Sequence, residues 1–154
     1  MIKLVRTDSE NKDFVEMVRQ LDAFLAERNG NEHSFYAQFN KIDLIKHVVI
    51  AYVHDVPVGC GAMKAFNSGT MEIKRMYTLP GNRGKGIATK VLAELEAWAH
   101  ELSYPNTVLE TGKNLPGAIG LYKKNGYTTI PNYGQYIGVE NSVCLGKEVG
   151  GGEV

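Results

Sequence analysis

The chain has 154 residues, of which 44% are hydrophobic and 22% are charged, as is typical of one globular domain with one core. Lysine plus arginine equals aspartate plus glutamate at 17 each, so the overall charge favours neither nucleic acid nor an anionic membrane as a partner. The sequence contains no apolar run of transmembrane length and no secretory leader, so we expect a cytoplasmic protein.

The first part of the chain predicts one strand and two helices. Residues 2–7 alternate apolar and polar side chains, which predicts a strand. Asp8 or Ser9 is expected to cap a helix that ends near Arg28, because apolar residues then recur at helical spacing. The mixed residues 31–46 predict a short second helix followed by a loop.

The middle of the chain predicts three strands and a long helix. Two β-rich runs at 47–53 and 56–64 flank His54-Asp55, which favours a tight hairpin, and residues 71–79 form the third run. After Gly81–Gly86 comes an amphipathic pattern with an apolar face made of Ile87, Val91, Leu92, Leu95, Trp98, Ala99 and Leu102.

The last third predicts another strand and helix. Residues 107–110 predict a short strand after Pro105. Asn114 can cap the following helix, Pro116 suits its first turn, and Gly126 suits its end.

The order of elements predicts one α/β (α+β) domain with a mixed sheet and helices on its faces. Two final strands are expected at 127–130 and 142–149, and the segment 71–110 should be a crossover between parallel strands. We expect the domain to span residues 1–149 and residues 150–154 to be a frayed tail.

The cysteines and histidines form no metal-binding pattern. Cys60 and Cys144 lie in apolar, strand-like runs, so we expect buried, reduced thiols. The four histidines are scattered along the chain without the spacing of metal ligands, and we predict no metal.

The glycine-rich segment before the long helix is the strongest candidate binding site. A helix N-terminus leaves backbone N–H groups unpaired and carries partial positive charge, to which Arg83 and Lys85 add. The segment lacks the Gly-Lys-Ser/Thr ending of a Walker loop, and Thr89 stands where a dinucleotide fingerprint needs glycine. From these residues alone, the segment is either a phosphate site or a structural turn.

Two motifs resemble those of the GNAT superfamily of N-acetyltransferases. The segment Arg83–Ala88 is similar to the family pattern Arg/Gln-x-x-Gly-x-Gly/Ala. Asn114, followed by Leu121-Tyr122 and then Gly126-Tyr127, resembles the second signature. The resemblance implies a GNAT-like acyl-CoA N-acyltransferase fold, in which a mostly antiparallel sheet of about seven strands is flanked by about four helices.

The resemblance further implies acetyl-CoA as co-substrate, held in a V-shaped opening between the fourth and fifth strands. Backbone groups of Met76, Tyr77 and Thr78 would run alongside the pantetheine arm, which Asn114 and Tyr122 would also contact. If the family's β-bulge is kept, an amide of Met76 or Tyr77 would donate to the thioester carbonyl. The pyrophosphate would be bound by Arg83, Gly84, Lys85, Gly86, Ile87 and Ala88.

Three residues are candidates for the chemistry. Tyr122 resembles the family's general acid, although a core tyrosine would show the same helical spacing. Glu72 stands where some members of the superfamily place the general base, and the alternative is an exposed or paired strand carboxylate. Glu110 is the other candidate base, and it could equally bind the ammonium group of the substrate.

Four further residues could contact the acceptor. Tyr133 and Tyr136 could line its pocket or could simply be aromatic residues at a strand edge. Lys74 and Arg75 are expected to be solvated, although such a basic pair could attract a substrate carboxylate.

The resulting hypothesis is direct acetyl transfer to a primary amine of a small, amino-acid-like metabolite, through a ternary complex. The alternatives are acetylation of protein lysines or N-termini and a non-catalytic CoA-binding sensor. A homodimer is an expectation from the family alone.

Overall fold

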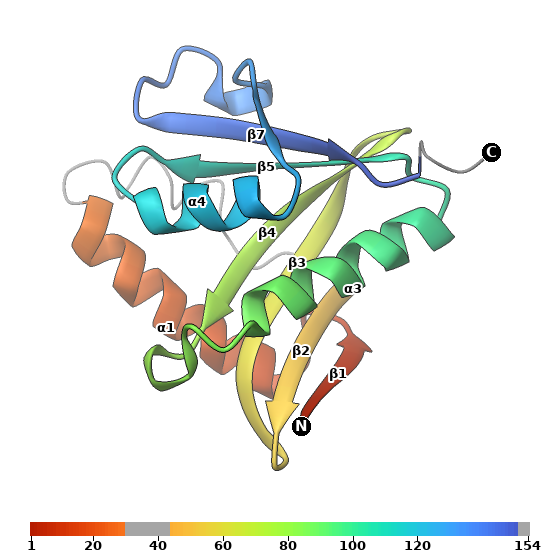
Figure 1. Cartoon of the computed structure of the whole chain (residues 1–154), viewed down its shortest axis with the longest axis vertical. Helices are drawn as coiled ribbons and strands as arrows, with labels where there is room; N and C mark the ends of the chain where they lie inside the picture. The colour runs from red at the N-terminus through yellow and green to blue at the C-terminus, as the bar shows by residue number, and fades with distance from the viewer. Residues whose placement is uncertain (30–43, 151–154) are drawn as a thin grey trace. The chain divides into compact units, whose positions relative to one another are not determined.

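The computed structural model describes residues 1–29 and 44–150, and Figure 1 labels most of the helices and strands in these ranges. Seven strands are hydrogen-bonded in the order β1-β2-β3-β4-β5-β7-β6. Their bounds are β1 (Ile2–Thr7), β2 (His47–Val53), β3 (Val56–Asn67), β4 (Thr70–Thr78), β5 (Asn106–Gly112), β6 (Thr128–Ile130) and β7 (Ser142–Glu148). The helices in this part of the chain are α1 (Lys12–Asn29), α3 (Ile87–Glu101) and α4 (Pro116–Lys124).

The pairing confirms the predicted mixed, mostly antiparallel sheet. The pairs β1–β2, β2–β3, β5–β7 and β6–β7 are antiparallel, while β4 and β5 are parallel, as expected for a strand–helix–strand crossover. The chain forms two compact units. The first contains Met1–Lys64 and Lys74–Leu95, and the second contains Ala65–Ile73 and Glu96–Val154.

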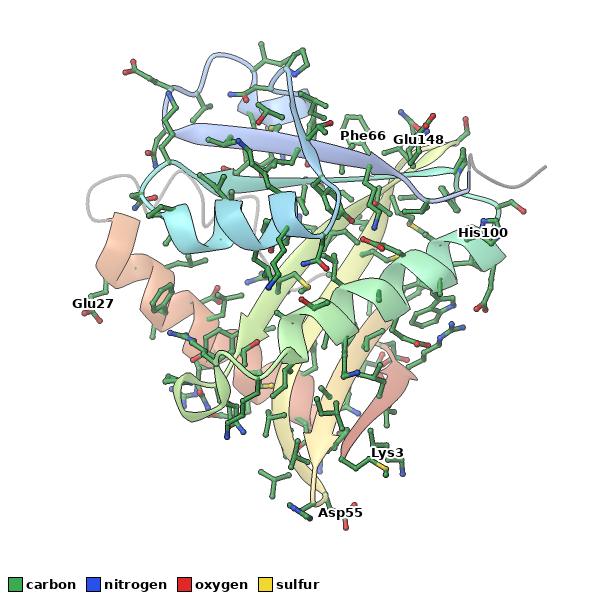
Figure 2. The ribbon with its side chains drawn as sticks, viewed as in Figure 1. Lys3, Glu27, Asp55, Phe66, His100 and Glu148 are labelled. Atoms are coloured by element: carbon green, nitrogen blue, oxygen red, sulfur yellow. The ribbon has the colours of Figure 1, made fainter. Side chains whose placement is uncertain are left out.

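The first unit contains the predicted hairpin. His54 and Asp55 adopt φ values of 51° and 65°, the left-handed conformation that a tight two-residue turn requires. Asp55 lies at the tip of this hairpin (Figure 2). The turn sets the register in which Val53 faces Val56, and a bulge follows between Ala51 and Tyr52.

Helix α1 begins later than predicted. Its first turn is capped by Asn11, whose Oδ1 accepts the amides of Asp13 (2.9 Å) and Phe14 (3.3 Å). The prediction of Asp8 or Ser9 as the cap was wrong, because Asp8 accepts the amide of Glu10 in a separate turn. The predicted second helix at 31–46 falls outside the described residues, except for 44–46, which are not helical.

The strand β3 presents different residues to α1 and to the first part of α3. Cys60 and Ala62 belong to the core cluster that contains Phe14 and Met17 of α1. Between them, Gly61 lies under α3, where an added Cβ would be 2.9 Å from Leu95 Cδ1. The alternation of a strand therefore packs α1 on side chains and α3 directly on glycine.

In the second unit, α4 begins at Pro116 and ends just before Asn125 and Gly126, as the proline and glycine predict. Asn114 is not its cap, because the cap position is held by Leu115, which makes no side-chain cap bond. The prediction that Leu102 belongs to the apolar face of α3 was also wrong, since the helix ends at Glu101 and Leu102 is 39% exposed.

Both cysteines are buried free thiols, as predicted. Burial raises the pKa of Cys60 to about 12, so this thiol remains protonated at neutral pH. None of the helices in the described ranges is long and apolar enough to cross a membrane.

Candidate functional site

The turn between β4 and α3 has the geometry of an anion site. Gly84 and Gly86 adopt φ values of 79° and 80°, which residues with a side chain rarely adopt. An added Cβ at either glycine would meet no atom within 4 Å, so it is the backbone conformation and not crowding that requires glycine here. The residues of the turn are exposed, so the face of the glycines is accessible to a ligand.

Helix α3 begins directly after this turn. The amide of Lys90 donates to the carbonyl of Gly86 at 3.1 Å, which makes Gly86 the first acceptor of the helix. In general, the first amides of a helix have no acceptor within it, and they carry the positive end of its dipole. The turn therefore presents backbone donors and positive potential together, as a phosphate requires.

The side chain of Arg83 is held within the first unit. Its Nε donates to the carbonyl of Thr78 at 3.0 Å, and its guanidinium lies over the rings of Phe24 (5.4 Å) and Tyr77 (5.8 Å). This arrangement joins the end of β4 to α1. The Nε of Arg83 is thus already engaged by a backbone carbonyl.

The strand β4 contains a local irregularity just before Met76 and Tyr77. Arg75 adopts a φ of 60°, a left-handed conformation that is uncommon for a residue with a side chain. Its carbonyl accepts a hydrogen bond from the Cys60 thiol at 3.4 Å. A left-handed residue inside a strand interrupts its alternation in the way that a β-bulge does.

The prediction that Arg75 is solvated was wrong. Its side chain is only 2% exposed, and Nη1 pairs with Asp22 of α1 at 2.8 Å. Among the described residues, Nε and Nη2 have no hydrogen-bond partner. Sequence reasoning missed this burial because the left-handed residue changes which face of β4 the side chain takes.

In the second unit, Glu72 is a buried and positioned carboxylate, not an exposed one. Tyr133 donates its hydroxyl to Glu72 Oε2 at 2.7 Å. The Tyr133 ring also packs edge-on against Phe66, labelled in Figure 2, with centroids 5.0 Å apart. Burial, and then the charge of Glu72, raise the pKa of Tyr133 above its ordinary value, so the phenol keeps the proton that it donates.

Glu110 is held in a similar way on the neighbouring strand. Ser142 donates its hydroxyl to Glu110 Oε2 at 2.7 Å. Both glutamates lie close enough to Tyr136 to raise its pKa, after the larger effect of burial. The structure therefore brings Glu72, Glu110, Tyr133 and Tyr136 into one cluster of the second unit.

Tyr122 lies on α4 and is buried, with 8% of its surface exposed. Its ring packs edge-on against Tyr127 with centroids 6.0 Å apart. Burial, and then the charge of Glu110, raise the pKa of Tyr122 above its ordinary value. The tyrosine is therefore protonated at neutral pH, as a proton donor must be, and it lies within the electrostatic reach of the carboxylate cluster.

Two further residues beside this cluster could not be predicted from the sequence. Ser142 and Cys144 join it through the antiparallel β5–β7 register, in which Glu110 pairs with Cys144 and Gly112 with Ser142. No local motif marks either residue. Asn114 is exposed beside Gly112.

Comparisons with known proteins identify the family of this chain. Residues 14–127 match the model of the acetyltransferase (GNAT) family. An uncharacterized N-acetyltransferase of Schizosaccharomyces pombe is 33% identical over 81 residues, which is 52% of this chain and half of the length of that protein.

Solved structures of other proteins have the same fold. A protein from Klebsiella pneumoniae assigned as an acyl-CoA N-acyltransferase has a TM-score of 0.81 and 28% identity, with 97% of this chain and 98% of that chain covered. PaiA N-acetyltransferase from Thermoplasma acidophilum, solved in complex with coenzyme A, shares the fold with a TM-score of 0.70. The two sequences are 17% identical, and the match covers 96% of this chain and 99% of that chain. With the family model matching most of its length, the chain belongs to the GNAT acetyltransferase family.

Proposed function

We propose that this protein transfers the acetyl group of acetyl-CoA directly to a primary amine of a small metabolite. The observation that carries the proposal is the open turn Arg83–Ala88, whose left-handed glycines expose backbone donors at the start of α3. Support also comes from the family match and from structural neighbours that hold coenzyme A.

In this proposal, the turn Arg83–Ala88 and the end of β4 bind the donor. The amides of the turn and of the first residues of α3 bind the pyrophosphate, and Lys85 adds positive charge. Backbone groups of Met76, Tyr77 and Thr78 follow the pantetheine arm. An amide just after the left-handed Arg75 donates to the thioester carbonyl, where negative charge develops during attack.

Tyr122 and the carboxylate cluster supply the groups that move protons and bind the acceptor. The amine nitrogen bonds to the acetyl carbon, and the bond from that carbon to sulfur breaks. Glu72, directly or through one water, takes one proton from the ammonium group before the attack, and Tyr122 donates a proton to the departing thiolate. The second proton that the nitrogen loses on becoming an amide returns to Tyr122. Glu110 binds the ammonium form of the acceptor, and Tyr133 and Tyr136 surround it with aromatic surface.

Release of free thiol from acetyl-CoA in the presence of a panel of small amines tests the proposal. The expected result is amine-dependent release with stoichiometric formation of the N-acetyl product, detected by mass spectrometry. If the panel yields no release although acetyl-CoA binds, the proposed reaction is wrong. Release only with proteins or peptides would instead contradict the small-molecule acceptor.

A further inference from the structure

Arg75 has a hydrogen-bonding edge to which none of the described residues is bound. A guanidinium has five N–H donors arranged in fixed, planar pairs. In Arg75, Nη1 is engaged by Asp22 Oδ1 at 2.8 Å. The two nitrogens without a partner among the described residues, Nε and Nη2, are those that form the side edge of the guanidinium.

This edge matches one class of ligand group. The N–H groups on Nε and Nη2 point in parallel, so they can donate to the two oxygens of one carboxylate. Leaving two buried donors unpaired is costly, and most buried polar groups in folded proteins have partners. Asp22 supplies one carboxylate, and the free edge has the geometry to accept a second.

The position of Arg75 in β4 points to the acceptor and not to the phosphates of the donor. Arg75 precedes Met76 and Tyr77, whose amides are assigned above to the thioester end of acetyl-CoA. The phosphates are assigned to the exposed turn that begins at Arg83, whose own Nε is already bound to Thr78. The left-handed backbone of Arg75 fixes the direction in which its side chain leaves the strand.

We propose that the Nε and Nη2 edge of Arg75 binds a carboxylate of the acceptor, so that the substrate is an amine that also carries a carboxylate. This assignment rests on the proposed acetyl transfer to a small amine and narrows its substrate class. Asp22 is a positioning residue, because its ion pair holds the guanidinium while its own side chain remains 48% exposed.

The test measures thiol release with α- and ω-amino acids, each paired with the amide that replaces its carboxylate. For wild type, kcat/KM for the favoured acid should exceed that for its amide by at least roughly tenfold, the scale of one bidentate charged contact. Arg75→Gln should abolish the preference through a higher KM for the acid. Arg75→Lys should restore only part of it, because lysine keeps the charge but lacks the planar edge.

A matched control is Arg19→Gln, which removes an exposed arginine of α1 and should leave the preference unchanged. Because Asp22 is half-exposed, Arg75→Gln leaves no buried unpaired carboxylate, and circular dichroism should confirm that it folds. Equal rates for acids and amides in wild type, or a preference that survives in folded Arg75→Gln, would overturn the assignment.

A binding arm separates this inference from the proposed reaction. If no amine supports thiol release, calorimetric titration of the N-acetylated amino acids and their amides still reports on Arg75. Binding of the acids to wild type but not to Arg75→Gln would support the carboxylate site although the proposed reaction had failed. Equal binding of acids and amides to both proteins would refute the site itself.

Discussion

At the scale of single residues, the two candidate catalytic carboxylates, Glu72 and Glu110, each accept a hydrogen bond from a neutral hydroxyl group. Tyr133 donates to Glu72 and Ser142 donates to Glu110, each at 2.7 Å. A neutral donor fixes a carboxylate in place without cancelling its charge. Each glutamate can therefore be oriented by its partner and still act on a basic substrate.

The two glutamates should differ in their kinetic effects. Glu72→Gln should lower kcat by about 100-fold with little change in KM for the amine, because it removes a general base. Glu110→Gln should mainly raise KM for the amine, because it removes a partner of the ammonium group. Steady-state kinetics with the best amine measures both, and the reverse pattern would exchange the two roles.

Removal of one phenol tests the proton donor. Tyr122→Phe should lower kcat by about 100-fold while the Kd of acetyl-CoA changes little, because only the proton for the thiolate is lost. The buried ring is retained, so the protein should still fold. Tyr104→Phe, also in the second unit, is the matched control, and wild-type turnover in Tyr122→Phe would remove this residue from the acid role.

At the scale of elements, the approach of α3 to β3 depends on the lack of a side chain at Gly61. Gly61→Ala would place a Cβ 2.5 Å from Met76 Sδ of β4, 2.9 Å from Leu95 Cδ1 and 3.0 Å from Val91 Cγ1. The free energy of unfolding should fall by about 1–3 kcal/mol, as for other overpacked cores.

Gly69→Ala is the matched control for this substitution, because an added Cβ there meets no atom within 4 Å. Urea denaturation should show a change of less than about 0.5 kcal/mol, as for ordinary surface substitutions. Equal stability of the two variants would show that α3 does not depend on this close approach.

Local sequence signals predicted the elements whose geometry they determine themselves. His54-Asp55 specified a two-residue hairpin, and Pro116 and Gly126 bounded α4. The predicted position of the α1 N-cap was wrong because Asp8, Ser9 and Asn11 are all residues that cap helices well. Which of them becomes the cap depends on where the helix meets the core. Local patterns do not contain that information.

The candidate site was predicted only in part for the same physical reason. Arg83–Ala88 is contiguous, so its chemistry is visible in the sequence. The hydrogen bond from Tyr133 to Glu72 spans 61 positions of the sequence, and the one from Ser142 to Glu110 spans 32. Such pairs become apparent only once the folded arrangement of the strands is known. The burial of Arg75 depends on one left-handed residue, which no periodicity predicts.

At the scale of the whole molecule, buried and partly buried phenols link stability to alkaline pH. The pKa values of Tyr52, Tyr122, Tyr127, Tyr133 and Tyr136 are all raised, chiefly by burial, and that of Tyr52 reaches about 12. The folded state thus holds these protons more tightly than the unfolded state does. Their stabilising contribution is full below about pH 10 and is lost as the pH rises through the folded pKa values.

The expected outcome is a free energy of unfolding that falls steeply above about pH 10, with phenolate absorbance that develops later in native than in unfolded protein. Urea denaturation and absorbance titration measure the two effects. Tyr52→Phe should make the loss less steep. Identical titration curves for native and unfolded protein would contradict the burial of these phenols.

The central claim is that the turn between β4 and α3 binds the pyrophosphate of acetyl-CoA. Calorimetric titration with acetyl-CoA and with S-acetylpantetheine, which lacks the phosphates, tests it most directly. Wild type should bind acetyl-CoA at least about 100-fold more tightly, and Gly86→Val should remove most of this difference because valine cannot adopt the left-handed backbone. Equal affinity of wild type for the two ligands, or an unchanged difference in Gly86→Val, would contradict it.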